Sequence, residues 1–230
     1  MTPEEINRII EIPSWDTHSA IKSEEAKFIY DFISANKLKI TLEIGFAFAM
    51  SASHIIAATN SKHIVCDPFQ SAYMDIGIKN IERLNFSDKL DYYADYSHNL
   101  LPSLLNAKER FEFIFIDGDH KFDGIMVDFY YSDLLLADNG YIMFHDTWMR
   151  STRLVESFIR KNRNDYRLVK VPHRNLLLFR KTGIDSRDAM FFKEFYNFKS
   201  ILKHSLIRWR SNGKKNMIEK LLIKIRNTVK

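Results

Sequence analysis

The chain has a single cysteine, and this shortage excludes several classes of protein. Cys66 is alone among 230 residues, so an internal disulfide framework cannot form, and the composition fits a reducing compartment. Cys66 lies inside the apolar run HIVC, which favours a buried structural thiol over a nucleophile. We therefore expect a cytoplasmic protein.

Glycine is also scarce, with 7 in the whole chain, and the phosphate-binding glycine motifs are missing. The one series that resembles a ligand loop begins at Gly45 and continues as Phe46, Ala47, Phe48 and Ala49. A dinucleotide site would need G-x-G-x-x-G to cradle its pyrophosphate, and a nucleoside triphosphate site would need G-K-[ST]. The sequence therefore argues against both kinds of phosphate cradle.

Targeting and membrane-spanning patterns are absent as well. The N-terminal stretch MTPEEINRII is acidic and does not resemble a signal peptide. The segment from Ile44 to Ser61 contains no charged residue, but its His54, Asn60 and hydroxyl side chains favour a strand, a turn and a helix. We expect no transmembrane segment.

The net charge of +5 is distributed unevenly along the chain. Residues 184–230 contain 12 Lys and Arg against 4 Asp and Glu, a balance of +8, whereas residues 1–183 contain 22 against 25, a balance of −3. This change of composition predicts a main domain over residues 1–183 and a basic tail over residues 184–230.

Alternating strand and helix patterns predict an α/β fold. Apolar runs predict strands in KITLEIG, KHIVCDP, LDYYADYS, FEFIFIDGDH and NGYIMFHDT, the last one opened by an Asn139–Gly140 turn, and a closing hairpin in YRLVKVP and NLLLFRK. Helical spacing predicts helices over 23–36, capped by Ser23, and over 51–58, 124–136 and 153–161. Together these elements predict a Rossmann-like, doubly wound, mostly parallel seven-stranded sheet with helices on both faces.

Polar residues stand where five of these strands end. In such sheets the ligand lies beyond the carboxyl ends of the strands, so these residues form the candidate site. In chain order they are Glu43 and Gly45, Asp67, Asp95, Asp117 and His120, and His145 and Asp146. Asp67 lies 22 residues after Gly45, where a carboxylate can accept the hydroxyls of a ribose. Acids at the first two strands without a phosphate loop favour a nucleoside that carries a cationic group.

Five segments, LEIGFAFAMSA, CDPFQ, ADYSHNLLP, FIFIDGDHKFDGIMVDF and YIMFHDTW, together resemble a class I S-adenosylmethionine-dependent methyltransferase. The most similar group comprises the small O-methyltransferases related to macrocin O-methyltransferases and cephalosporin hydroxylase-like proteins, over residues 20–182. The resemblance implies S-adenosylmethionine as cofactor, with Glu43 and Gly45 beside its methionine part and Asp67 on its ribose. It places Asp95 and Ser97 near the adenine, and Asp117 in contact with the cofactor as well.

The resemblance also implies chemistry for the last two strand ends. In metal-dependent members, an acid after the fourth strand and an acidic pair after the fifth hold magnesium, which lowers the pKa of the acceptor hydroxyl. The matching ligands are Asp117, His145 and Asp146, with His120 as general base and Asp117 orienting the acceptor. Because His145 replaces an expected acid, and imidazole suits transition metals better than magnesium, the identity of a divalent metal stays open.

Several of these residues also have structural interpretations. Asp67 and Asp95 could be a turn residue and a surface residue, and His120 and His145 could be core histidines. Asp119 is expected to support the loop after the fourth strand rather than to act in the site.

The basic tail continues an apolar stripe at helical spacing, through Phe191, Phe195, Phe198, Leu202, Leu206 and Trp209. One interpretation is a helical appendage that packs on the domain or on a second subunit, which would make the protein a homo-oligomer. The other is a basic amphipathic surface that binds anionic lipid or an anionic acceptor, which would make the protein membrane-peripheral. Nucleic-acid binding is disfavoured, since the basic residues flank an aliphatic stripe rather than exposed stacking aromatics.

The sequence thus predicts an S-adenosylmethionine-dependent O-methyltransferase that acts on a hydroxyl of a sugar, a glycan or a small natural product. A metal-dependent, oxygenase-like tailoring enzyme on the same fold is one alternative. The other is a non-catalytic nucleoside-binding or assembly protein, because the methyl groups of Ala47 and Ala49 could crowd a cofactor.

Overall fold

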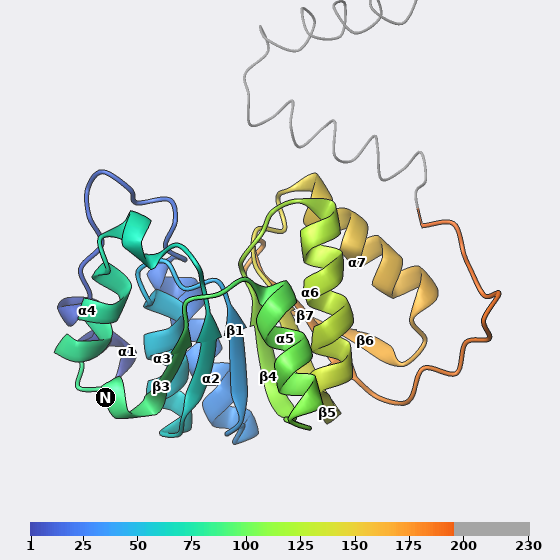
Figure 1. Ribbon diagram of the computed structural model, residues 1–230, viewed down its shortest axis with the longest axis horizontal. Helices are drawn as coiled ribbons and strands as arrows, with labels where there is room; N and C mark the ends of the chain where they lie inside the picture. Colours follow the sequence, from blue (N-terminus) through green and yellow to red (C-terminus); the bar gives the residue numbers. More distant parts are fainter. Residues whose placement is uncertain (196–230) are drawn as a thin grey trace, which may run out of the picture. The chain divides into compact units, whose positions relative to one another are not determined.

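A seven-stranded sheet organises the part of the chain that the computed structural model describes, residues 1–195 (Figure 1). Its strands are β1 (Thr41–Ile44), β2 (His63–Cys66), β3 (Leu90–Tyr93), β4 (Phe111–Ile116), β5 (Leu136–Phe144), β6 (Tyr166–Val169) and β7 (Leu177–Lys181). They lie in the order β3-β2-β1-β4-β5-β7-β6, with the first five parallel and β7 antiparallel to both of its neighbours. The predicted sheet and its closing hairpin are confirmed.

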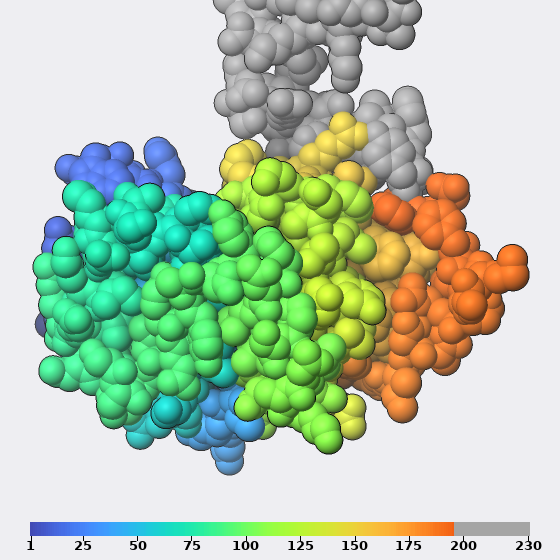
Figure 2. Space-filling model, viewed as in Figure 1, coloured from blue at the N-terminus to red at the C-terminus, as the bar shows by residue number. Residues whose placement is uncertain are grey.

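Helices cover both faces of this sheet. They are α1 (Pro3–Ile9), α2 (Ser23–Asn36), α3 (Met50–Thr59), α4 (Ile76–Arg83), α5 (Ser97–Asn106), α6 (Phe122–Leu135) and α7 (Arg150–Asn162), with short 3-10 turns at Gln70–Tyr73 and Ser87–Lys89. Apolar residues of α5, α6 and α7 share one core cluster with the sheet, and those of α2 and α3 share another. In Figure 1, α5 and α6 lie on the side of the sheet that faces the viewer, and in Figure 2 their green and yellow-green atoms form the middle of this face.

The central strand β4 shows why its apolar run is unbroken. Phe113 and Phe115 pack toward the cluster of α2, while Ile114 and Ile116 pack toward the cluster of α6, and each is at most 3% exposed. Successive side chains of a strand point to opposite faces, so a strand covered by helices on both sides needs apolar residues at every position.

Two local predictions are wrong. Ser23 is the first residue of α2 rather than its cap: the cap position is Lys22, whose backbone N–H donates to the carboxylate of Glu25 at 3.1 Å. Asn139–Gly140 does not open the fifth strand but lies inside β5, which begins at Leu136 directly after α6. The pairing of β5 with β4 shifts register there, and Asn139 has a φ of 63°, so the turn-forming residues accommodate a bulge.

The compact unit that contains the sheet is Met1–Phe191. After β7, residues 182–195 contain neither helix nor strand. The remainder of the predicted helical tail, including the stripe from Phe198 onward, lies outside the described residues. None of the helices in residues 1–195 combines the length and hydropathy needed to cross a bilayer.

Candidate active site at the strand ends

A cavity of about 1130 Å³ opens at the carboxyl ends of the parallel strands. Its walls are the loops after β1, β2, β4 and β5, the start of α5, and the segment of residues 17–22 that precedes α2. Ligand cavities usually measure roughly 300–1,000 Å³. This cavity can therefore hold a nucleoside-sized molecule together with a second, smaller one.

Gly45 joins the ends of β1 and β4. Its φ is 93°, and a Cβ at this position would lie 2.2 Å from the carbonyl oxygen of Asp117. Only glycine permits such an approach of two backbones, so its first role is to bring the two strand ends together. Downstream, Ala47 and Ala49 have φ values of 42° and 62°, in the left-handed region that glycine adopts more readily than alanine. Ala49 is fully buried outside the cavity lining, so only the methyl group of Ala47 lies where a ligand would meet it.

Asp67, at the end of β2, fixes the shape of the loop after β1. Its Oδ2 accepts the backbone N–H groups of Phe46 and Ala47 at 2.9 and 3.1 Å, and its Oδ1 accepts that of Phe69 at 2.7 Å. A carboxylate offers about four acceptor sites, so one site on Oδ1 stays available. Asp67 lines the cavity, and that site can accept a ligand hydroxyl.

Glu43 is 1% exposed, and hydrogen bonds to neighbouring buried side chains fix its carboxylate. It accepts the hydroxyl of Ser51, and its Oε2 lies 2.9 Å from Nε2 of His63, whose Nδ1 lies 2.8 Å from the hydroxyl of Thr41. Burial raises the pKa of Glu43, and the hydrogen bond from His63 opposes this shift. Glu43 therefore forms part of the cavity wall as a member of an internal polar network.

After β3, only one of the two residues that were predicted to contact the adenine lines the cavity. Ser97 lines the cavity, whereas Asp95 is outside the lining, and its Oδ1 accepts the backbone N–H of Tyr96 at 2.7 Å and the amide of Asn99 at 2.9 Å. Asp95 thus fixes the start of α5. Sequence reasoning missed Phe69 and Tyr96, which line the cavity as an edge-to-face pair with ring centroids 5.8 Å apart. Both residues follow shortly after a strand end, and this position is the signal that could have identified them as site residues.

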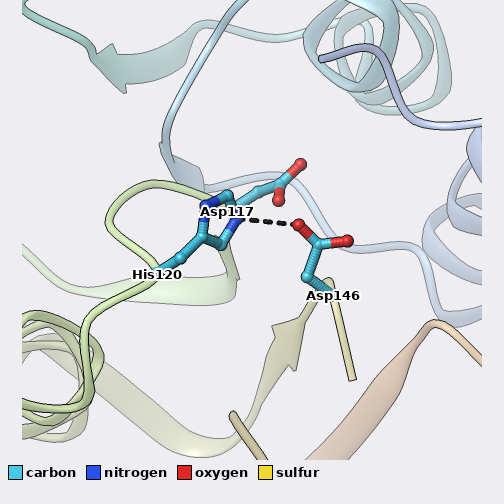
Figure 3. Close-up of side chains that lie close together, drawn as sticks. All are labelled: Asp117, His120 and Asp146. Atoms are coloured by element: carbon cyan, nitrogen blue, oxygen red, sulfur yellow. Dashed lines mark ion pairs between the residues drawn. The ribbon is translucent and has the colours of Figure 1, made fainter. Parts of the chain in front are cut away.

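Three side chains from the ends of β4 and β5 come together at the other end of the cavity (Figure 3). Nε2 of His120 pairs with Oδ2 of Asp146 at 2.7 Å, and one ligand atom each from Asp117, His120 and Asp146 lie within 4.8 Å of one another. The hydrogen bond to Asp146 raises the pKa of His120. Burial raises the pKa of Asp146, but the hydrogen bond from His120 and the charge of His145 outweigh it and lower the pKa to about 2.

His145, the third predicted metal ligand, is not a member of this group of three but contacts two of its members, and its Nδ1 lies 3.4 Å from Oδ1 of Asp146. Its Nδ1 lies 3.1 Å from Oδ1 of Asp117, and its Nε2 lies 3.3 Å from Oε2 of Glu25. Burial lowers the pKa of His145, but the charge of Asp117 and the hydrogen bonds to Asp117 and Glu25 raise it to about 10. When both of its ring nitrogens carry a proton, His145 can donate to Asp117 and to Glu25 and hold these acids in place.

Glu25 is a cavity residue that the sequence analysis did not identify. It is 4% exposed and connects the first turn of α2 to the imidazole of His145. Burial raises the pKa of Glu25, but the hydrogen bonds from His145 and from the backbone of Lys22, together with the charges of both residues, outweigh burial and lower the pKa. No local pattern distinguishes this acid from an ordinary one in a first helical turn.

Solved structures share this architecture. The O-methyltransferase of Bacillus cereus in complex with SAH aligns with a TM-score of 0.61 at 18% identity, covering 79% of this chain and 90% of that chain. The SAM-bound O-methyltransferase TomG of Streptomyces achromogenes, involved in tomaymycin synthesis, aligns with a TM-score of 0.62 at 12% identity, covering 78% and 95%. A SAH-bound methyltransferase of Podospora anserina aligns with a TM-score of 0.59 at 13% identity, covering 79% and 86%.

These likenesses show that the chain has the class I S-adenosylmethionine-dependent methyltransferase fold. The model of a protein family described as a methyltransferase domain matches residues 42–147, which run from β1 to the loop after β5. A comparison with curated protein sequences finds no match.

Proposed function

We propose that this protein transfers a methyl group from S-adenosylmethionine to a hydroxyl group of a sugar, a glycan or a small natural product. The observation that carries this proposal is one cavity with two different ends. The loops after β1 and β2 and the start of α5 form a nucleoside-like end, and the acids and histidines after β4 and β5 form a reactive end. The resemblance to small O-methyltransferases of the macrocin group supports hydroxyl acceptors.

The residues at the nucleoside end fit the cofactor. Asp67 retains one acceptor site for a ribose hydroxyl, Ser97 offers a hydroxyl, and Phe69 and Tyr96 offer apolar ring surface to a base. The loop after β1 lacks a phosphate cradle, which agrees with a ligand that carries no phosphate. When bound, S-adenosylmethionine supplies an activated methyl group on a sulfonium centre.

The reactive end can move a proton. A neutral His120 that donates its Nε2–H to Asp146 has Nδ1 available to accept the proton of the acceptor hydroxyl. Asp146 then stabilises the imidazolium that forms, in the way that a buried carboxylate supports a histidine base. Asp117, held by His145, lies beside this pair and can orient the hydroxyl. A well-placed base of this kind accelerates a reaction by roughly 10²–10⁴-fold.

Asp117, His120 and Asp146 can also hold a divalent metal ion. Two carboxylates and one imidazole form a mixed donor set, which favours manganese, iron or zinc over magnesium. Such an ion would lower the pKa of a nearby hydroxyl. In that case His120 would be a ligand and could not also act as the base, so metal binding and base catalysis by His120 are alternatives.

Calorimetric titration with S-adenosylhomocysteine tests the cofactor part of the proposal. We expect micromolar affinity, about −8 kcal/mol. Asp67→Ala should weaken binding by roughly 1.5–3 kcal/mol, because a charged acceptor is lost. Asp91→Ala is the matched control, since Asp91 lies in β3 outside the cavity lining and pairs with Lys62. Undetectable binding, together with unchanged thermal stability in saturating ligand, would refute the proposed cofactor.

Methyl transfer from radiolabelled S-adenosylmethionine tests the catalytic part. His120→Ala should reduce turnover by roughly 10²–10⁴-fold and leave the affinity for S-adenosylhomocysteine nearly unchanged. His173→Ala is the control, because His173 packs against Phe28 and lies outside the cavity lining. Full turnover by His120→Ala would assign the histidine a structural role.

A further inference from the structure

Asp128 is a buried acid that the proposed chemistry does not use. It lies on α6 and is 1% exposed, and neither of its carboxylate oxygens has a hydrogen-bond partner in the part of the chain that the structure describes. By comparison, Asp133 on the same helix pairs with Arg163 and Lys181. Buried carboxylates in folded proteins are paired as a rule, so an unpaired one requires an explanation.

The polar side chain that acts most strongly on this carboxylate belongs to Ser97, the first residue of α5, which packs beside α6 (Figure 1). Burial raises the pKa of Asp128 to about 6, and the nearby hydroxyl of Ser97 opposes this shift. The charge of Asp119 adds to the rise, and that of His98 opposes it. Ser97 lines the cavity and Asp128 does not, so Asp128 can act on a ligand through the hydroxyl of Ser97.

The carboxylate of Asp128 determines what Ser97 can offer to a ligand. A serine hydroxyl has one proton to donate and two lone pairs that accept, whereas a carboxylate can only accept. Rotation of the Ser97 side chain about its Cα–Cβ bond can direct the proton to Asp128. The oxygen of Ser97 then presents only lone pairs to the cavity, so it can bind a donor group and cannot donate to an acceptor group.

We propose that Asp128 is a positioning residue that makes the cavity selective for adenine, because it takes the proton of Ser97. The amino group of adenine donates hydrogen bonds, whereas the carbonyl oxygen at the same position of hypoxanthine accepts them. A Ser97 that can only accept therefore favours adenine. Phe69 and Tyr96 offer ring surface to either base and do not distinguish them. This inference rests on the proposed function and concerns recognition of its cofactor.

Calorimetric titration of the full-length protein with S-adenosylhomocysteine and with S-inosylhomocysteine tests the proposal, since these ligands differ only in the base. The wild type should bind the adenine compound at least about tenfold more tightly, because the wrong base leaves a polar group unpaired. Asp128→Leu cannot accept the proton of Ser97, so the hydroxyl becomes free to donate to hypoxanthine. The preference should then fall to about threefold or less, through a gain in affinity for S-inosylhomocysteine. A disrupted site would instead lose affinity for both ligands.

Two further variants test whether the effect passes through the hydroxyl. Ser97→Ala should lower the preference as far as Asp128→Leu does, and the double variant should show no further change, because residues that act as one unit are not additive. Asp133→Asn is the matched control from the same helix. It should lower stability by weakening the ion pairs with Arg163 and Lys181 and leave the preference unchanged.

Urea denaturation at pH 7.5 distinguishes positioning from a structural role. A carboxylate whose folded pKa is raised above its unfolded value destabilises the fold at this pH. Asp128→Asn, which keeps the size of the side chain and can donate to Ser97, should therefore have a urea midpoint no lower than that of the wild type, together with a reduced preference for adenine. A lower midpoint with an unchanged preference would assign Asp128 a structural role.

The outcomes separate this inference from the proposed function. If the wild type does not bind S-adenosylhomocysteine, the proposed function itself fails. If it binds that ligand but binds S-inosylhomocysteine equally well, the selectivity proposal alone is overturned. The same conclusion follows if the preference survives in both Asp128 variants or in Ser97→Ala.

Discussion

The charge on His145 should make the stability of the protein depend on pH between 7 and 9. The pKa of His145 is raised to about 10 in the folded chain, whereas an unfolded histidine titrates near 6.5. A raised folded pKa contributes stability that is complete below the unfolded value and is lost as the pH rises through the folded value. Between pH 7 and pH 9, the deprotonation of this one group should therefore lower the free energy of unfolding by about 2.5 kcal/mol.

The substitution His145→Gln should remove this dependence. It leaves the carboxylates of Asp117 and Glu25 without their cationic partner, and both are largely buried, at 16% and 5% side-chain exposure. Breaking such a buried interaction typically costs about 3–5 kcal/mol, so the variant should be less stable at pH 7 and its stability should change little up to pH 9.

Urea denaturation followed by circular dichroism at pH 7, 8 and 9 measures both effects. His54→Gln is the matched control: His54 is fully buried in α3, its pKa is lowered by burial, and it stays neutral across this range. That variant should lose stability but keep the pH dependence of the wild type. Equal pH dependence in the wild type and in His145→Gln would refute the assignment of a charged His145.

Further predictions concern the loop after β1, the metal and the tail. Ala47→Gly should raise the free energy of unfolding by about 0.5–1 kcal/mol, since Ala47 has a φ of 42°. The control Ala52→Gly, inside α3, should lower the free energy of unfolding, and urea midpoints measure both changes. Gly45→Ala should lower the free energy of unfolding by more than about 3 kcal/mol, because the added Cβ would lie 2.2 Å from the carbonyl oxygen of Asp117. In calorimetric titrations, manganese or zinc should bind more tightly than magnesium, and Asp146→Asn should abolish binding; equal affinity for magnesium would contradict the mixed donor set. A chain ending at residue 195 should fold and bind S-adenosylhomocysteine, and only the full chain should sediment with anionic liposomes; equal sedimentation would end the membrane interpretation of the tail.

Much of the fold follows from local patterns in the sequence. The unbroken apolar run of β4 and the helical spacing of residues 23–36 determine those elements, because the periods of strand and helix differ. The parallel order follows from strands that alternate with helices. The Asn139–Gly140 pair was misplaced because a left-handed residue suits a bulge as well as a turn, and only the pairing with β4 decides between them.

The sequence by itself also determined which groups gather at the ligand edge, because parallel strands place their carboxyl ends on the same side of a sheet. Only the tertiary structure decided how those groups pair. Asp95 is next to its strand end but is bound to the first turn of α5, whereas Glu25 reaches His145 across 120 positions of the chain. Such pairings depend on how α2 packs against the sheet and on how each loop leaves its strand. No local periodicity records them, because the contacts form between residues that are neighbours only after the chain has folded.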